Sequence, residues 1–155
     1  MSTALEPRVP AEVRAALDAD PDPHAGLTLL LLTVSEGWPH QAMLSVGEVV
    51  ALDESRLALA LWPQSSAARA LATDGRATLT LVLPPTSFAL RVDAVAAGEI
   101  ETPLAGHRAR FTATVVAAAS DTAPYATLTS GVRFSLNDPG AVVARWREVR
   151  EALRT

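Results

Sequence analysis

The residues of this sequence that could do acid–base or ligand chemistry are few, and three of them are histidines. His24 lies in a polar, proline-rich linker, where we interpret it as a solvated surface residue. His40 follows a Gly-Trp-Pro turn and is expected to be a hydrogen-bonded strand-end residue, or else to approach the edge of a ligand. His107, beside Arg108, is interpreted as a surface residue, with the alternative that it reaches across a dimer interface. No two histidines have the i, i+4 spacing of a helical zinc site, so the sequence predicts no metal site.

Several catalytic motifs are missing from the sequence. It has no cysteine, which removes disulfides, thiolate catalysis and cysteine–metal sites and fits a reducing compartment. It also has no Gly-x-Ser-x-Gly elbow, no Walker loop and no GxGxxG run. These patterns argue against a hydrolase, an NTPase and a Rossmann-type protein.

The composition predicts one folded domain over residues 1–155 with a rather apolar surface. Hydrophobic residues make up 49% and charged residues 19% of the chain, and a buried subunit interface would account for that balance. The net charge of −4 and a pI near 5.3 provide no basic stripe, so we expect no nucleic-acid partner. The amino terminus has no secretory signal pattern and no apolar run is long enough to span a bilayer, so we expect no membrane partner and a cytoplasmic protein.

A short uncharged run at residues 27–34 and alternating apolar and polar residues elsewhere predict a mainly β fold with short helices. Strands are expected at residues 27–34, 40–52, 57–62, 77–83, 88–94, 111–117 and 132–136, and residues 99–108 are expected to be a loop or a short helix. Helices are expected at residues 10–19 and 65–73. The C-terminal helix has a cap at Asp138, and its apolar stripe consists of Val142, Val143, Trp146, Val149 and Leu153.

These elements favour a closed or nearly closed barrel of about six to seven antiparallel strands. Closure would remove the exposed edges that so many apolar strands would otherwise present. Residues 1–26 would form an N-terminal helix and linker, residues 27–136 the barrel, and residues 138–155 the C-terminal helix.

Three segments carry a resemblance to a known family: GWPHQAML at residues 37–44, LALALWPQSSAARAL at residues 57–71 and DGRATLTLV at residues 74–82. In these segments, and in the closing FSLNDPGAVVARWREVREAL, the chain resembles the pyridoxamine 5′-phosphate oxidase-like, FMN-binding split-barrel superfamily. The resemblance covers the chain from about residue 27 to the last helix. It implies a split β-barrel and a homodimer with two flavin sites in the subunit interface.

The resemblance also implies which residues hold the cofactor ring. The backbone of two strand segments would line the ring, and Trp62 would form a wall. These residues are Gln41, Ala42, Met43, Leu44 and Ser45 in one segment and Leu61, Trp62 and Pro63 in the other. Met43 has the alternative of filling the core, and Trp62 that of packing at a strand end.

The phosphate site is where the sequence departs from the family. The basic residues of the family fall at Ala42, Gly47, Ser66 and Ala67 here, so all four are lost. Ser65 and Ser66 could still meet a phosphate with hydroxyls and helix N–H groups, and Arg69 could supply charge. The alternative is that a serine only caps the helix and that Arg69 is a solvated residue.

The resemblance implies a dimeric FMN-binding protein, an oxidoreductase that uses flavin for hydride transfer to or from an unidentified small molecule. The missing basic residues favour an alternative, a cofactor-free split-barrel protein that serves binding or assembly. A third possibility is a deazaflavin or haem in the same cleft. Pyridoxamine 5′-phosphate is a poor substrate candidate, because its phosphate would also need basic partners.

Overall fold

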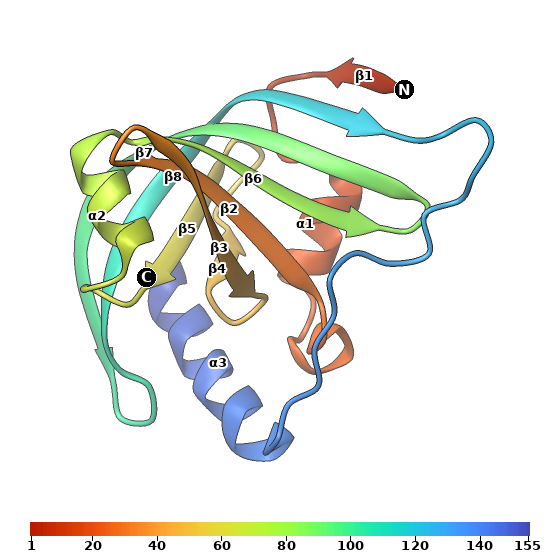
Figure 1. The fold of residues 1–155 in the computed structure, drawn as a ribbon. Helices are drawn as coiled ribbons and strands as arrows, with labels where there is room; N and C mark the ends of the chain where they lie inside the picture. Colours follow the sequence, from red (N-terminus) through yellow and green to blue (C-terminus); the bar gives the residue numbers. More distant parts are fainter.

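The computed structural model describes residues 1–155 and contains one eight-stranded antiparallel sheet with short helices around it (Figure 1). The strands are β1 (Ser2–Leu5), β2 (Thr28–Ser35), β3 (Trp38–Ser45), β4 (Val49–Ala51), β5 (Arg56–Leu61), β6 (Arg76–Leu83), β7 (Thr86–Thr102) and β8 (Gly106–Asp121). The helices are α1 (Ala11–Asp18), the 3₁₀ helix η1 (Asp22–His24), α2 (Ser66–Thr73) and α3 (Pro139–Arg154). None of the helices combines the length and the apolar character needed to cross a membrane.

The sheet curls into a barrel that stays open along one side. Its strand order is β3-β2-β6-β7-β8-β5-β4, and β1 pairs with the far end of β8. β3 and β4 end this order and do not pair with each other, so the barrel is split between them. This confirms the prediction of a split barrel and shows that closure is incomplete.

The chain crosses the split between Ser45 and Val49, in a short turn that we call the crossing (residues 46–48). The prediction of one strand over residues 40–52 is therefore wrong, because β3 and β4 lie at opposite ends of the strand order. The turn is closed by the backbone N–H of Gly47, which donates to Ser45 Oγ at 3.2 Å. The backbone N–H of Glu48 donates to the Ser45 carbonyl at 3.2 Å.

Two further expectations need correction, and one strand was not expected. Residues 99–108 are neither a loop nor a helix, since β7 and β8 continue as one long hairpin that pairs as far as Thr102 and Gly106. Residues 132–136 are not a strand, because only Arg133 pairs, in an isolated bridge with Leu27. β1 was not predicted at all. Its four residues are exposed, so no apolar alternation marks it.

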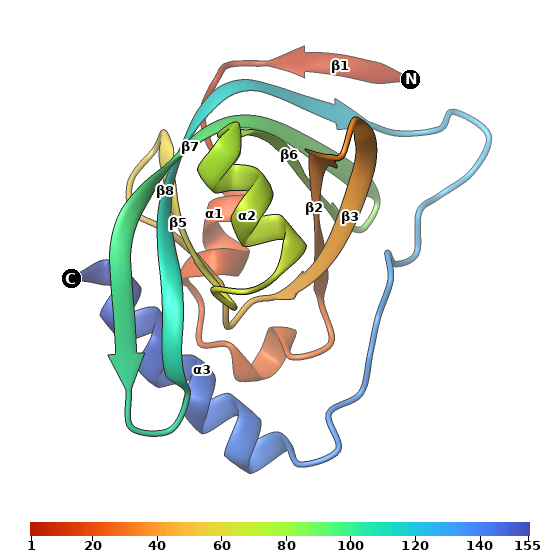
Figure 2. The same ribbon diagram turned by 60° about the vertical axis from the view of Figure 1, so that its left-hand side comes forward.

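The expected helices are present and cover the barrel. α1 and α2 lie at opposite ends of it, which Figures 1 and 2 show from two sides. The predicted inner face of α1 is buried, with Val13, Ala16 and Leu17 in the interior. α3 begins at Pro139 with Asp138 as its cap, as predicted, because the Asp138 side chain accepts a hydrogen bond from the Ala141 N–H.

One charged residue of α3 is buried rather than solvated. Arg150 is only 2% exposed, and its guanidinium donates to the carbonyl oxygens of Val46 at 2.5 Å and Ala19 at 2.9 Å, and also to that of Leu17. No carboxylate pairs with it, and burial lowers its pKa. Arg150 thus ties α3 to the crossing and to the end of α1.

Candidate functional site

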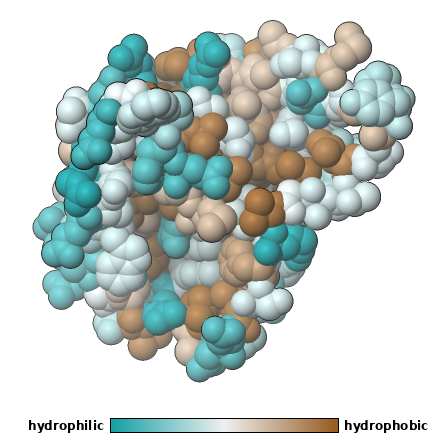
Figure 3. All heavy atoms as spheres, in the orientation of Figure 1, coloured by the Kyte–Doolittle hydropathy of each residue, from teal (hydrophilic) through white to brown (hydrophobic).

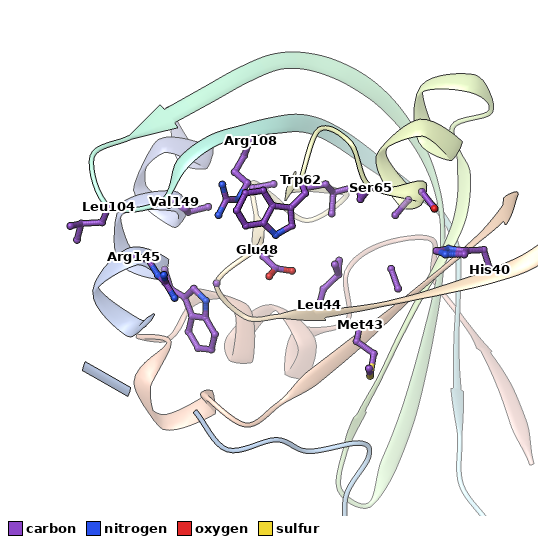
Figure 4. Close-up of a pocket in the computed structure, with 18 residues that line it drawn as sticks. His40, Met43, Leu44, Glu48, Trp62, Ser65, Leu104, Arg108, Arg145 and Val149 are labelled. Atoms are coloured by element: carbon purple, nitrogen blue, oxygen red, sulfur yellow. The ribbon is translucent and has the colours of Figure 1, made fainter. Parts of the chain in front are cut away.

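A cavity of about 650 Å³ lies at the split of the barrel (Figure 4). One wall comes from β3 and the crossing, and a second from the end of β5 and the start of α2. The tip of the β7–β8 hairpin and one face of α3 complete it. Side chains from the edge strand β3, from the crossing and from the end of β5 therefore face one space.

Most of the predicted cofactor residues line this cavity. They are Ala42, Met43, Leu44, Leu61, Trp62, Ser65 and Ser66. Gln41, Ser45, Pro63 and Arg69 do not line it. The structure therefore brings together side chains from β3, β5 and α2 that are separate in the sequence.

The serines at the start of α2 have local partners as well as a place in the cavity. Ser65 Oγ accepts a hydrogen bond from the Ala68 N–H at 3.1 Å, which makes Ser65 the helix cap. Arg69 folds back on the same turn, donating to the Gln64 carbonyl at 2.6 Å and to Ser66 Oγ at 3.4 Å. The exposed Arg69 side chain thus contacts the start of its own helix and stays outside the cavity.

Two of the three histidines, those for which the sequence left a role at a ligand or an interface open, lie in different environments. His40 lines the cavity from β3, and its Nδ1 is a buried atom with no hydrogen-bond partner. His107 lies in the β7–β8 hairpin, where its Nε2 is 3.0 Å from Glu99 Oε2. Nowhere do three His, Cys, Asp or Glu side chains gather in a way that could hold a metal ion.

Trp62 and Arg108 form a stacked pair in the cavity. The Arg108 guanidinium lies 3.5 Å from the centroid of the Trp62 ring. This is a cation–π geometry, and Trp62 itself is 63% exposed. Burial lowers the pKa of Arg108, with the Arg145 charge adding to the effect and the Glu48 carboxyl opposing it. Sequence reasoning placed Trp62 in the site but missed Arg108, which comes from β8.

Glu48 supplies a carboxyl group at the crossing. Burial raises its pKa to about 7, although the Ser45 N–H, 3.4 Å from Oε2, and the Arg108 charge oppose that shift. No basic side chain lies within ion-pair distance of this carboxyl. Glu48 is therefore close to half-protonated at neutral pH. Its position next to a glycine in an apolar segment gave no signal for this role.

α3 contributes Arg145 and Trp146 to the cavity, and sequence reasoning assigned neither to the site. Trp146 was expected in the core, and it is half-buried against the core cluster while also lining the cavity. Arg145 is exposed on the same helix. Both come from the last helix, so nothing local in the sequence links them to β3.

Comparison with solved structures identifies the class of fold. A protein from Lactobacillus delbrueckii, proposed to be a pyridoxamine 5′-phosphate oxidase, aligns with a TM-score of 0.55 and 15% sequence identity, over 74% of this chain and 97% of that chain. The chain thus shares the split-barrel fold of that protein.

The sequence comparison identifies a family within this fold. The chain is 34% identical to the uncharacterized protein YclD of Bacillus subtilis (strain 168) over 126 residues. This alignment covers 81% of each protein. The chain therefore belongs to the same family as YclD. No family model matches the sequence.

Proposed function

We propose that the cavity at the split is an FMN site and that the protein is a flavin-dependent oxidoreductase acting on a small molecule. The observation that carries the proposal is the convergence of β3, β5 and the start of α2 on one cavity. These are the segments in which the family resemblance implies contacts with the flavin. A cytoplasmic location, which the lack of cysteine fits, belongs to the same proposal.

The dimensions and polarity of the cavity fit a flavin ring. A volume of about 650 Å³ lies within the range of roughly 300–1,000 Å³ that small-molecule sites occupy. β3 is an edge strand that pairs only with β2, so the backbone groups on its outer side are free to hydrogen-bond a planar heterocycle. His40 Nδ1, buried without a partner, is one further polar atom in the cavity wall.

The chemistry of the proposed reaction would come from the cofactor. Bound FMN supplies hydride transfer, while the residues of the chain bind and orient the ring and the substrate. This division of labour fits a cavity whose lining is mostly apolar, with His40, Glu48, Arg108 and Arg145 as its titratable side chains.

We also propose that the protein is a homodimer in which the cavity is completed at the interface. Met43, Trp62 and Leu104 line the cavity and are 64%, 63% and 54% exposed in the single chain. Hydrophobic side chains also reach the surface across the middle of the face that β3 crosses (Figure 3). A second copy would cover such side chains. Sedimentation should give a dimer, and a monomer at micromolar concentration would contradict this arrangement.

Titration of the purified protein with FMN tests the cofactor. We expect saturable quenching of flavin fluorescence, and we expect Trp62→Ala to weaken binding by about tenfold because it removes a wall of the cavity. Trp38→Ala is the matched control: Trp38 is 76% exposed and lies outside the cavity, so its removal should leave the affinity unchanged. The visible spectrum of the purified protein would separate FMN from a haem or a deazaflavin.

The second candidate function is binding or assembly without a cofactor. The observation in its favour is the absence of basic side chains at Ala42, Gly47, Ser66 and Ala67, where the resemblance has them. Absence of quenching at high micromolar FMN would support this function and contradict the first.

A further inference from the structure

Two arginines face the cavity without a carboxylate partner. Arg108 reaches it from β8 and Arg145 from α3, and neither takes part in any ion pair. Elsewhere this chain does pair its arginines, for example Arg56 with Asp53 and Arg147 with Asp20. Other arginines, such as Arg150 and Arg154, also lack an ion pair, so what sets Arg108 and Arg145 apart is that both line the cavity.

Most of the hydrogen-bonding capacity of the two guanidinium groups is unused. A guanidinium has five N–H donors, and Arg108 uses Nη1 for a bond of 2.8 Å to the His107 carbonyl. The guanidinium of Arg145 has no hydrogen-bond partner within the chain. The stack on Trp62 holds the Arg108 guanidinium in the cavity by its flat face, which leaves its edge available to a ligand.

Glu48 is the one carboxylate in the cavity lining, and it does not neutralise these charges fully. It lies outside ion-pair distance of both arginines, and burial favours its neutral form. The charge of Arg145 lowers the pKa of Arg108, because the two guanidinium charges repel each other. An oxyanion between them would relieve this repulsion and could be bound in a bidentate manner.

We propose that Arg108 and Arg145 form an oxyanion-binding subsite for the phosphate or carboxylate of an aromatic ligand whose ring packs beside Trp62. This subsite comes from β8 and α3, whereas the lost basic positions lie on β3, at the crossing and at the start of α2. If the oxyanion is the FMN phosphate, the inference rests on the proposed function. If the oxyanion belongs to a substrate, the subsite is independent of the flavin.

The test compares Arg108→Gln and Arg145→Gln with Arg154→Gln. Arg154 is an exposed arginine of the same helix that lies outside the cavity and has no ion pair, so its variant is the matched control. Arg145 is exposed and takes part in no ion pair, so Arg145→Gln keeps the test valid even if the loss of the Trp62 stack destabilises Arg108→Gln. The probes are FMN, riboflavin, inorganic phosphate and benzoate, measured by calorimetry.

We expect the wild type and Arg154→Gln to bind phosphate or benzoate, and both cavity variants to bind the same probe at least about tenfold more weakly. FMN binding that is tighter than riboflavin binding, with the difference lost in both variants, would assign the subsite to the cofactor phosphate. Equal FMN and riboflavin affinities with loss of benzoate or phosphate binding would assign it to a substrate.

Two negative results remain distinguishable. If neither flavin binds the wild type, the proposed function fails, while phosphate and benzoate still test the subsite. The subsite proposal is overturned if both cavity variants bind every probe as tightly as the wild type. It is also overturned if the wild type binds neither phosphate nor benzoate and does not distinguish FMN from riboflavin.

Discussion

Trp146 packs directly over Gly47, so closely that a Cβ atom on residue 47 would lie 2.0 Å from Trp146 Cγ. The indole of α3 thus occupies the space that a side chain at the crossing would need. The family resemblance has a basic residue at this position, and the chain has a tryptophan from α3 there instead. The packing of α3 on the crossing therefore leaves no space for a basic side chain at residue 47.

Gly47→Ala should destabilise the protein by about 1–3 kcal/mol, because Trp146 or the crossing must move to admit the methyl group. Urea unfolding measures the change. Gly140→Ala in the first turn of α3 is the matched control, since a Cβ atom there meets nothing within 4 Å. Equal stability of the wild type and Gly47→Ala would show that the close packing of Trp146 does not hold in solution.

Arg150→Met should cost about 3 kcal/mol of unfolding free energy, because it leaves the buried carbonyls of Val46 and Ala19 without their donor. Arg147→Met, one turn away, removes an exposed ion pair with Asp20 and should cost less than about 1 kcal/mol. Thermal unfolding of both variants measures the contrast. Similar losses for the two would refute the role of Arg150 as a buried tie.

Stability should fall as the pH rises from about 4.5 to 7, because of Glu48. Its pKa in the folded protein is raised to about 7 from 4.5, so within this window the folded state holds a proton that the unfolded state releases. Glu48→Gln should remove this slope and be about 1–3 kcal/mol more stable than the wild type at pH 8. The pKa values of Asp53 and Asp74 are lowered to about 2, so these residues lose their contribution to the stability of the fold only below about pH 4.

Chemical denaturation at pH 5 and pH 8 separates these contributions. The exposed Glu101, which has no ion pair, provides the control Glu101→Gln, and this variant should keep the slope of the wild type. A slope that survives in Glu48→Gln would assign the effect to another group.

The strands that sequence reasoning predicted best are short apolar runs or alternating segments. β2, β5 and β6 were predicted within a residue or two of their ends; β6 alternates between buried and partly exposed residues, whereas β5 is buried from Leu57 to Leu61. The crossing was missed because apolar residues lie close on both sides of it, and Gly47 and Glu48 are its only local marks. Residues 132–136 alternate as a strand would, yet the segment finds no strand edge to pair with beyond the single bridge at Arg133.

The candidate site also has a part that was predicted from the sequence and a part that was not. Its walls from β3, β5 and the start of α2 lie in the segments that carry the family resemblance, and the resemblance predicted them. Arg108, Arg145 and Trp146 come from distant elements and meet the cavity only through tertiary packing of the hairpin and of α3. A hydrogen bond of 2.9 Å from the Leu104 N–H to Glu148 Oε2 joins these two elements, and no pattern in the sequence indicates it.

Oxyanion binding to the cavity should weaken several-fold between pH 6 and pH 8, since ionised Glu48 adds a negative charge beside Arg108 and Arg145. Sulfate is the suitable probe because its charge is constant over this interval. Glu48→Gln should bind sulfate with nearly constant affinity, at least as tightly as the wild type at pH 8. His40 is the histidine that lines the same cavity, so His40→Gln is the control and should keep the wild-type slope. A slope that is lost in His40→Gln and kept in Glu48→Gln would assign the effect to the histidine and refute the coupling to Glu48.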